Sequence, residues 1–455
     1  MARIYPFRAL RYNPSRVRLE DVVTQPYDKI TPPMQQAYYQ RSPYNLVRII
    51  LGLPELFDGT EGNDGAGTSD VYRRAARDFA DWRAEGILVR EKEACIYAYS
   101  QRFPIPVGGG PGSNGVVAER RGFIALGELS DYSQGVVFRH EQTLSRPISD
   151  RLNLLRATRG HFGQIFMLYS DPAQTAERLL FANIASPDLE VTDEFGVLHR
   201  ISRISDPSTI NILSAAMEDK KLIIADGHHR YETALEYSRE YAPAYPATSE
   251  RNTYSLPQPP YPEAAVMMTF VNMDAEGIVI LPTHRVVFGL KDFAPTEFLE
   301  RAAAFFEIES LGDLETGEIL DRLALNGAAQ TAFVAVTADG RYLLKAKSAA
   351  VVEALKHVPE RRRRLGIVQL HSLVLEQLLG ITTADIREQR NVHYLREAGE
   401  AMEEVTEGRA NVAFLANPVT LDQLREIAFA RDVMPPKSTD FYPKLLSGLA
   451  IYGLD

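Results

Sequence analysis

Apolar residues along this chain form short runs that alternate with segments of helical spacing, and one junction between the two patterns organises the sequence. Residues 222–225 are a continuous apolar run and predict a buried strand. Directly after them, the spacing of Ala234, Leu235 and Tyr237 predicts an amphipathic helix over residues 231–239. The five residues between, Asp-Gly-His-His-Arg at 226–230, therefore lie where a strand passes into a helix.

The same patterns predict a mixed α/β core followed by a smaller α+β module. Strand, helix, strand and helix succeed one another across residues 162–240, which is typical of a mixed α/β core. Later in the chain, two predicted helices precede a hairpin that turns at Asp339-Gly340. We therefore expect two domains, residues 1–290 and residues 291–455.

The strand-to-helix junction has the composition of an anion site. A helix start presents free backbone N–H groups and the positive end of the helix dipole. Gly227 would let the backbone take a positive φ and approach a ligand closely. His228, His229 and Arg230 would add donors for phosphate or carboxylate, and Asp226 could be a general base or a metal ligand. In the alternative, Asp226 only caps the helix and the histidines are solvated or bonded to neighbouring carbonyls.

A second cluster follows another short apolar run. His140 and Glu141 come at its end, and Glu141 could be a general base or a Mg²⁺ ligand. The alternative is a salt bridge from Glu141 to Arg139 or Arg151. Arg151 is also a candidate phosphate ligand, on a helix that Ser149 is expected to cap.

Two later segments carry further candidates for an anion site. His284 and Arg285 end a predicted strand, and together with the clusters above they could converge on one anion. Residues 434–444 are irregular and contain Lys437 and Lys444 beside hydroxyl and aromatic side chains, which suits an anionic ligand with a flat group. This last segment could return to the site, or it could be a strap on the surface.

Composition narrows the class of protein. The 455 residues are 45% hydrophobic and 24% charged, as in an ordinary globular protein. The net charge of −10 argues against a nucleic-acid partner, and a small-molecule substrate is expected instead. No apolar run reaches the ~18 residues of a membrane span and the first residues lack the apolar stretch of a signal peptide, so we expect a cytoplasmic protein.

Three familiar kinds of site are excluded by particular residues. Cys95 is the single cysteine, which excludes an internal disulfide and a cysteine-based zinc site. His140-Glu141 does not extend to the zinc-protease motif, because Leu144 stands where the second histidine is needed. Residues 104–115 are rich in glycine, but no Gly-Lys-Ser/Thr follows them, so they are not a P-loop.

Several motifs together resemble the 1015 family of domains of unknown function. Besides the sequence Asp-Gly-His-His-Arg-Tyr-Glu-Thr-Ala at 226–234, the matching motifs are Pro6-Phe-Arg, Pro26-Tyr-Asp, Ser42-Pro-Tyr-Asn, His140-Glu, Asp150-Arg-Leu, Leu281-Pro-Thr-His-Arg and the stretch 434–444. They span residues 6 to 444, which is nearly the whole chain. The chain is therefore identified as a member of that family.

The resemblance implies a fold and a kind of ligand. The family is similar to the ParB/sulfiredoxin-like superfamily, whose members use an Asp/Glu-Gly-x-x-Arg motif at a helix start to hold nucleotide phosphates. That superfamily includes ParB, sulfiredoxin and a nucleotide-dependent free serine kinase. It implies a ParB/sulfiredoxin-like core, with the C-terminal module as an addition. Histidines replace the catalytic cysteine of sulfiredoxin here, so reduction of sulfinic acids is not expected.

The resulting hypothesis is phosphoryl transfer to a small hydroxyl metabolite, as in a serine kinase. His228, His229 and Arg230 would hold phosphates of a nucleotide or of pyrophosphate, and Asp226 or Glu141 would be the base or would carry Mg²⁺. Gly227, His140, Arg151, His284, Arg285, Lys437 and Lys444 complete the candidate phosphate-binding set. Two alternatives remain: a phosphatase for a small phosphomonoester such as phosphoserine, and a non-catalytic nucleotide-binding switch of the ParB type.

Overall fold

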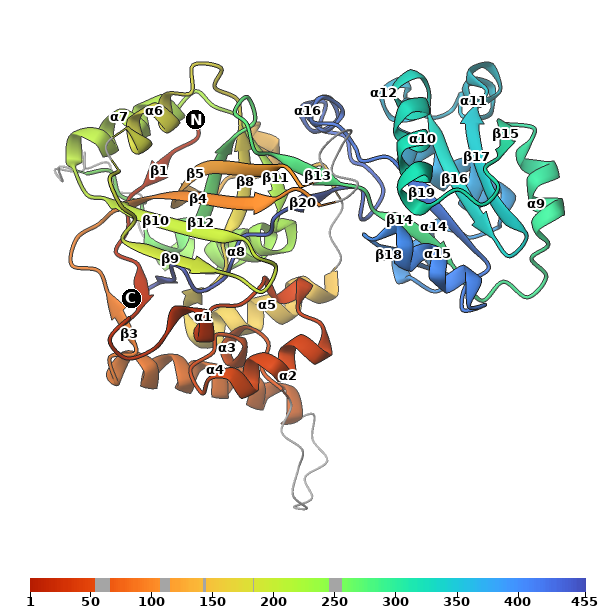
Figure 1. Ribbon diagram of the computed structural model, residues 1–455. Coiled ribbons are helices and arrows are strands. Elements are labelled where there is room, and N and C mark those ends of the chain that lie inside the picture. Colours follow the sequence, from red (N-terminus) through yellow and green to blue (C-terminus); the bar gives the residue numbers. More distant parts are fainter. Residues whose placement is uncertain (54–65, 107–114, 142–144, 183, 245–255) are drawn as a thin grey trace, which may run out of the picture.

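The computed structural model describes residues 1–53, 66–106, 115–141, 145–182, 184–244 and 256–455. It has two lobes, shown side by side in Figure 1. Leu144 and residues 107–114 lie outside the described residues, so the predictions made on them stay predictions. Among the described residues, no helix is long and apolar enough to cross a membrane.

The first lobe is built on a nine-stranded mixed sheet. In spatial order its strands are β6 (Val137–Phe138), β11 (Leu222–Asp226), β8 (Ile165–Tyr169), β12 (Ala265–Asn272), β5 (Val117–Glu128), β4 (Ile96–Pro104), β10 (Leu198–Ile204) and β9 (Leu189–Thr192), while β1 (Ile4–Tyr5) also pairs with β5. β11 runs parallel to β6 and antiparallel to β8. All residues of β8 and β12 are buried, as expected for central strands covered on both faces.

Helices cover both faces of this sheet (Figure 1). One group is α6 (Thr175–Phe181) and α7 (Pro207–Met217); the other contains α8 (His228–Tyr241), α5 (Ser145–Thr158), α4 (Ala66–Ala84), α3 (Val47–Ile50), α2 (Pro32–Arg41) and α1 (Leu19–Val22). Short elements connect them: β2 (Leu10–Tyr12), β3 (Leu88–Arg90), β7 (Gly160–His161), and the 3₁₀ turns η1 (Tyr27–Lys29), η2 (Tyr132–Gln134), η3 (Ala242–Ala244) and η4 (Pro262–Ala264). The predicted mixed α/β core is confirmed.

The second lobe is a six-stranded antiparallel sheet with helices around it. Its strand order is β15 (Phe306–Ser310), β17 (Gly340–Ala346), β16 (Ala332–Thr337), β19 (Val412–Ala416), β14 (His284–Val287) and β18 (Val392–Leu395). The helices are α9 (Pro295–Ala302), α10 (Thr316–Ala329), α11 (Ser348–Ala354), α12 (Glu360–Arg363), α13 (Gly366–Gln369), the π-helix η5 (Leu370–Leu378), α14 (Thr383–Glu388), α15 (Ala398–Thr406) and α16 (Leu421–Phe429). The hairpin predicted at Asp339-Gly340 is confirmed by β16 and β17.

The lobes do not divide the chain at residue 290. β14 already belongs to the second sheet, because its backbone pairs with β18 and β19. The chain then returns to the first lobe: β20 (Asp440–Tyr442) pairs with β13 (Val279–Leu281), and β21 (Tyr452–Gly453) pairs with β7. The C-terminus accordingly lies beside the first lobe in Figure 1. Residues 434–455 are therefore part of the first lobe's structure, and much of this segment is buried rather than a surface strap.

Two helix starts differ in whether a local capping residue is used. Thr31 caps α2 as its side chain accepts from the Met34 N–H, and proline follows at the first helical position. Ser149 does not cap α5, because that helix already begins at Ser145. Single capping residues are weak signals when tertiary packing can extend a helix past them.

Candidate functional site

The strand-to-helix junction forms as the sequence predicts. β11 ends at Asp226, and α8 begins at His228. Gly227 between them has φ +94°, a left-handed conformation that favours glycine. No side chain caps the helix, so the predicted alternative in which Asp226 is the cap is not what forms. The first-turn N–H groups of α8 have no acceptor within the helix, which is the usual basis of an anion site.

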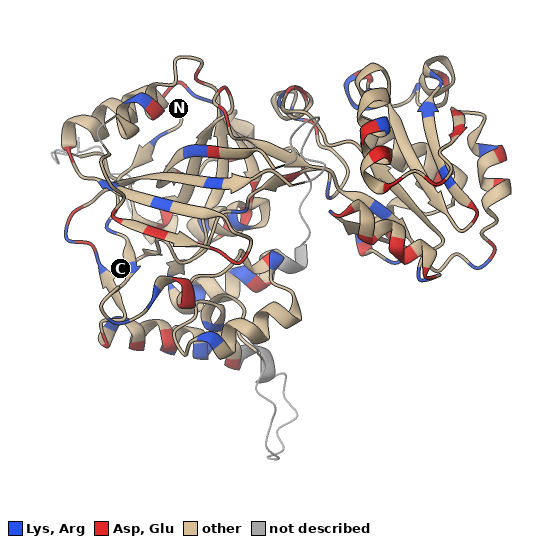
Figure 2. Ribbon diagram, viewed as in Figure 1, with Lys and Arg blue, Asp and Glu red and all other residues tan. Residues whose placement is uncertain are grey.

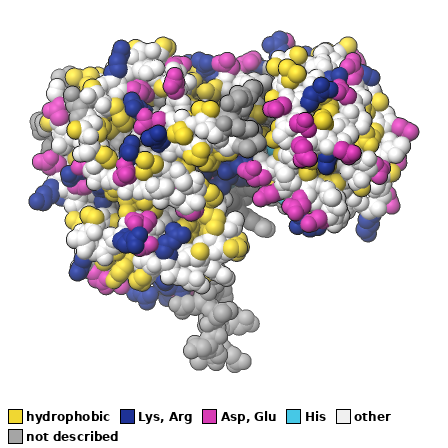
Figure 3. All heavy atoms as spheres, in the orientation of Figure 1, with side chains coloured by type: hydrophobic (Ala, Val, Ile, Leu, Met, Phe, Trp, Pro, Cys, Tyr) yellow, Lys and Arg dark blue, Asp and Glu magenta, His cyan; other side chains and the backbone are white. Residues whose placement is uncertain are grey.

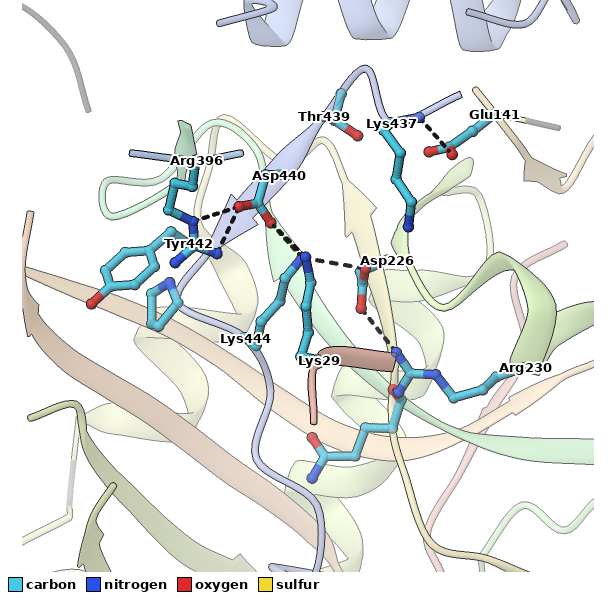
Figure 4. A network of polar contacts seen from close by, with 12 residues as sticks. Lys29, Glu141, Asp226, Arg230, Arg396, Lys437, Thr439, Asp440, Tyr442 and Lys444 are labelled. Carbon is cyan, nitrogen blue, oxygen red and sulfur yellow. Dashed lines mark hydrogen bonds and ion pairs between the residues drawn. The ribbon is translucent and has the colours of Figure 1, made fainter. Parts of the chain in front are cut away.

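Asp226 is held between two cations (Figure 4). Its Oδ2 accepts a hydrogen bond from Arg230 at 2.9 Å, and its Oδ1 lies 3.4 Å from the Lys444 Nζ. Arg230 also donates to the Gln164 carbonyl. Burial on its own raises the pKa of Asp226, but Lys444 and Arg230 outweigh burial and hold that pKa well below its usual range. Asp226 is therefore an ionised carboxylate in a fixed position.

A second carboxylate, Asp440, continues the ion-pair network on the other side of Lys444. The Lys444 Nζ lies 2.9 Å from the Asp440 Oδ1, and Lys29 lies 3.5 Å from the same oxygen. Arg396, from the second lobe, contacts the Asp440 Oδ2 at 2.6 Å. Burial alone would lower the pKa of Lys444, but Asp226 and Asp440 together raise it above its usual value. The network joins both lobes and residues more than 400 positions apart.

Glu141 lies beside Lys437 at one end of this network (Figure 4). The Lys437 backbone N–H donates to the Glu141 Oε1 at 3.0 Å, and the Met434 N–H donates to the His140 carbonyl at 2.8 Å. These bonds hold the segments around residues 140 and 435 together. Burial raises the pKa of Glu141 above its usual value, against the lowering effect of Lys437. Of the carboxylates Glu141, Asp226 and Asp440, Glu141 is thus the one whose pKa is raised and the most readily protonated.

The histidines of the site are uncharged. The His140 and His228 rings lie edge to face with centroids 4.7 Å apart, and the His140 Nε2 is 2.8 Å from the Thr439 Oγ1. Burial lowers the pKa of His140 to about 4 and that of His228 well below its usual value. Burial also lowers the pKa of His229. Any contribution of these rings to anion binding is therefore through hydrogen bonds rather than charge.

Three predicted phosphate ligands do not face this site. Arg151 donates to the Ile50 carbonyl at 2.5 Å and its guanidinium lies over the Tyr27 ring. The His284 Nδ1 accepts the Ala416 N–H at 3.3 Å. Arg285 is buried and donates to the Lys437 carbonyl at 2.9 Å, so it positions the segment that carries Lys437. We correct the prediction accordingly: each of these side chains hydrogen-bonds within the protein, although the buried Arg285 Nε has no hydrogen-bond partner among the described residues.

A cavity of about 720 Å³ brings five of the remaining candidates together, whereas His140, Gly227 and His229 are not among its lining residues and Arg230 lines a separate pocket with Arg151. The walls of the 720 Å³ cavity come from both lobes and include Glu141, Asp226, His228, Lys437 and Lys444 from the predicted set. The volume is in the range of roughly 300–1,000 Å³ that is typical of small-ligand sites. On the surface face seen in Figure 3, acidic and basic side chains are interspersed over both lobes. Figure 2 shows the same mixture along the individual elements.

The sequence did not single out three charged residues of the ion-pair network, although all three line the cavity. Lys29 directly follows the motif that ends at Asp28, and Asp440 lies within the segment 434–444, so a signal was present for both. Arg396 stands in no motif and reaches the cavity from the second lobe. Its role depends on how the lobes meet, which local sequence does not encode.

The predicted Mg²⁺ ligands do not fit a metal held by the protein. Both carboxylate oxygens of Asp226 face cations, and the Glu141 Oε1 accepts a backbone N–H. Across the described ranges, no three or more His, Cys, Asp or Glu side chains group in a way that could hold a metal ion. The site as built balances its carboxylates with lysine and arginine.

Comparisons with solved structures returned distant likenesses. Free serine kinase in complex with AMP is 13% identical with a TM-score of 0.31, covering 67% of this chain and 83% of that one. A conserved hypothetical protein from Pyrococcus furiosus is 12% identical with a TM-score of 0.32, covering 68% and 89%. SbnI with C-terminal truncation from Staphylococcus aureus is 11% identical with a TM-score of 0.33, covering 71% and 85%. Scores this low establish neither a shared site nor a shared activity.

Sequence comparison is more decisive. A search of curated proteins found no match. The family model described as "Protein of unknown function (DUF1015)" matches residues 4–367, which is most of the chain. The resemblance seen in the motifs is thereby confirmed, and the chain belongs to this family.

Proposed function

We propose that this protein transfers a phosphoryl group from a nucleotide or pyrophosphate to the hydroxyl of a small metabolite, within the 720 Å³ cavity. The observation that carries the proposal is the meeting of an uncapped helix start, two lysines and a carboxylate with a raised pKa in one cavity. Phosphoryl transfer needs little covalent chemistry from the protein and depends on positioning and charge stabilisation. The cavity supplies both.

The start of α8 is the proposed phosphate-binding end. No side chain caps its first turn, and Gly227 has no side chain to keep a phosphate away. The side chain of Lys437 points toward the space beside Asp226 in Figure 4. Lys444 is fixed by Asp226 and Asp440, so its charge is already in place when the transition state forms.

Glu141 is the proposed general base. It would take the proton of the acceptor hydroxyl, whose oxygen then forms a bond to phosphorus while the bond from phosphorus to the donor oxygen breaks. A raised pKa suits a base that works near neutral pH. Asp226 is less suited, because its two cationic partners hold it ionised and make it a weak base. We assign Asp226 to positioning Lys444 and Arg230.

The test is a ³¹P NMR assay of the full chain. ATP, ADP or pyrophosphate would be supplied with Mg²⁺ in solution and with small hydroxyl metabolites, serine first. A new phosphomonoester that appears only with an acceptor supports the proposal. Release of inorganic phosphate from phosphoserine would instead indicate a phosphatase. A thermal shift by nucleotide, with no turnover of any acceptor, would indicate the non-catalytic switch.

The variant Glu141→Gln separates the base from the rest of the site. We expect turnover to fall by about 10²–10⁴-fold, the usual contribution of general base catalysis, while donor binding persists. Glu236→Gln is the matched control, because Glu236 is exposed on α8 and should leave turnover unchanged. Full activity of Glu141→Gln would refute the assignment of the base.

A further inference from the structure

A second cavity, of about 650 Å³, is lined by the same two segments that carry Glu141 and Lys437. Arg139, two residues before Glu141, faces this second cavity, and so do residues 434–436, which lead into Lys437. The opposite wall belongs to the second lobe and comes from α12, α14 and the π-helix η5. Neighbouring residues of the paired segments thus line two different cavities.

The charge of the second cavity is predominantly positive. Arg139, Arg362 and Arg387 line it, and Glu376 is the one carboxylate among its described lining residues. Glu376 accepts a hydrogen bond from the Thr383 hydroxyl at 2.7 Å. Three guanidinium groups around one space are the arrangement with which proteins bind phosphate through paired N–H donors.

Internal ion pairs compensate this positive charge only in part. The Arg139 guanidinium is 3.4 Å from Glu232, and the Arg362 Nε is 3.9 Å from Asp432, at the outer limit of an ion pair. The Arg362 Nε is buried and has no hydrogen-bond partner within the described part of the chain. Arg387 is exposed, and the described residues offer it no carboxylate within ion-pair distance.

A buried histidine adds a second, independent sign of a ligand. His371 lines the cavity and is 5% exposed, and its Nε2 has no hydrogen-bond partner among the described residues. It lies on the nine-residue π-helix η5, a rare conformation that is often found at functional sites. Burial, together with the charge of Arg285, keeps the pKa of His371 well below its usual value. A neutral ring of this kind can donate one hydrogen bond to an anion.

We propose that this second cavity is a binding site for a small phosphate-bearing anion, held by Arg139, Arg362 and Arg387, distinct from the site of the proposed phosphoryl transfer. The hydroxyl of Ser372, which also lines it, completes the set of donors. The proposal does not rest on the proposed function, since it concerns binding alone.

Occupancy of this cavity would act on the first one through the shared segments. A backbone hydrogen bond joins Met434 to His140, and the Lys437 backbone N–H donates to the Glu141 carboxylate. An anion bound to Arg139 and packed against residues 434–436 would therefore stabilise the positions of both the proposed base and its lysine neighbour.

Isothermal titration of the full chain with pyrophosphate at low ionic strength tests the site. Pyrophosphate could also enter the first cavity, so four variants are compared. Arg362→Met and Arg387→Met should each weaken binding by about tenfold or more, the loss of one charged hydrogen bond. Arg361→Met is the matched control, because Arg361 is exposed on α12 beside Arg362 and does not line the cavity. Lys437→Met should leave this binding event intact.

Each result decides the proposal. Unchanged affinity in both Arg362→Met and Arg387→Met, or loss only in Lys437→Met, would overturn it. Citrate that binds as tightly as pyrophosphate, with the same losses in the variants, would reassign the site to carboxylates. Hydrogen exchange gives a readout besides affinity: pyrophosphate should slow exchange of the Met434 and Lys437 amides in the wild type and not in Arg387→Met.

Discussion

The two cavities of this protein differ in how their charges are balanced. In the first, Lys444 is paired with Asp226 and Asp440, and these carboxylates have further cationic partners. In the second, three arginines line the cavity with one carboxylate: Arg139 pairs with Glu232 at 3.4 Å and Arg362 with Asp432 at 3.9 Å, and Arg387 has no carboxylate within ion-pair distance among the described residues. A pre-paired site keeps its geometry without a ligand, which suits catalysis. An unbalanced site gains stability when an anion arrives, which suits binding.

The first prediction concerns the removal of Lys444, which lies at the centre of the paired network. Lys444→Met should lower the free energy of unfolding by about 3 kcal/mol, the low end for breaking a buried ion pair, because Arg230 and Arg396 still serve the two carboxylates. Urea denaturation measures the change. Lys356→Met is the control: the pair of Lys356 with Glu353 is exposed, so its loss should cost under about 1 kcal/mol. Equal costs in the two variants would show that burial of the network contributes nothing.

The second prediction concerns pH. The folded protein holds the pKa values of Asp226 and Asp440 below their usual range, so their stabilisation is present above about pH 4 and is lost as the pH falls below that value. The raised pKa of Lys444 has the opposite sign: its stabilisation is present below about pH 10 and is lost as the pH rises further. Urea midpoints between pH 2.5 and 11 should therefore decline at both ends. Asp440→Asn should flatten the acid side, and an unchanged acid slope would contradict this account.

The difference between the cavities also shows what the sequence can reveal. The junction at residues 226–230 could be predicted, because apolar periodicity and a glycine before a helix are local signals. The contact of Asp226 with Lys444 spans 218 positions and follows from the return of the chain to the first lobe. The boundary at 290 was misplaced for a similar reason: β14 joins the second sheet through pairing with β19, more than 120 residues later.

The type of a residue predicted whether it lies in or beside the site better than it predicted what the residue does there. Arg285 and Lys437 were both expected to bind phosphate, yet burial turns Arg285 into a support for the Lys437 carbonyl. The sequence indicated Arg139 only as a possible partner of Glu141, although Arg139 faces the second cavity. Whether an arginine is paired inside the protein or left for a ligand depends on tertiary neighbours, which the pattern along the chain does not contain.

A third, smaller effect is expected at the junction itself. Gly227→Ala should lower the free energy of unfolding by about 1–2 kcal/mol, because alanine is strained at φ +94°. The added Cβ would also lie 3.0 Å from the Arg230 Nε and disturb the support of Asp226. Gly399→Ala is the counterpart: Gly399 is in α15 with open space around it, so alanine should stabilise the helix by up to about 1 kcal/mol. Opposite signs in denaturation would confirm that Gly227 is required for its conformation.

The smallest effect is expected for Arg387→Met, and it bears most directly on the contrast between the cavities. Arg387 is exposed, and without an anion its charge lies near Arg139 and Arg362 at the same cavity. Removing it should change the free energy of unfolding by less than about 0.5 kcal/mol without an added anion. With pyrophosphate present, the wild type should gain stability in a thermal melt and the variant should gain less, since ligand binding adds to stability by mass action. A large loss of stability in Arg387→Met without any anion would mean that this arginine serves the fold, and the second cavity would then resemble the first.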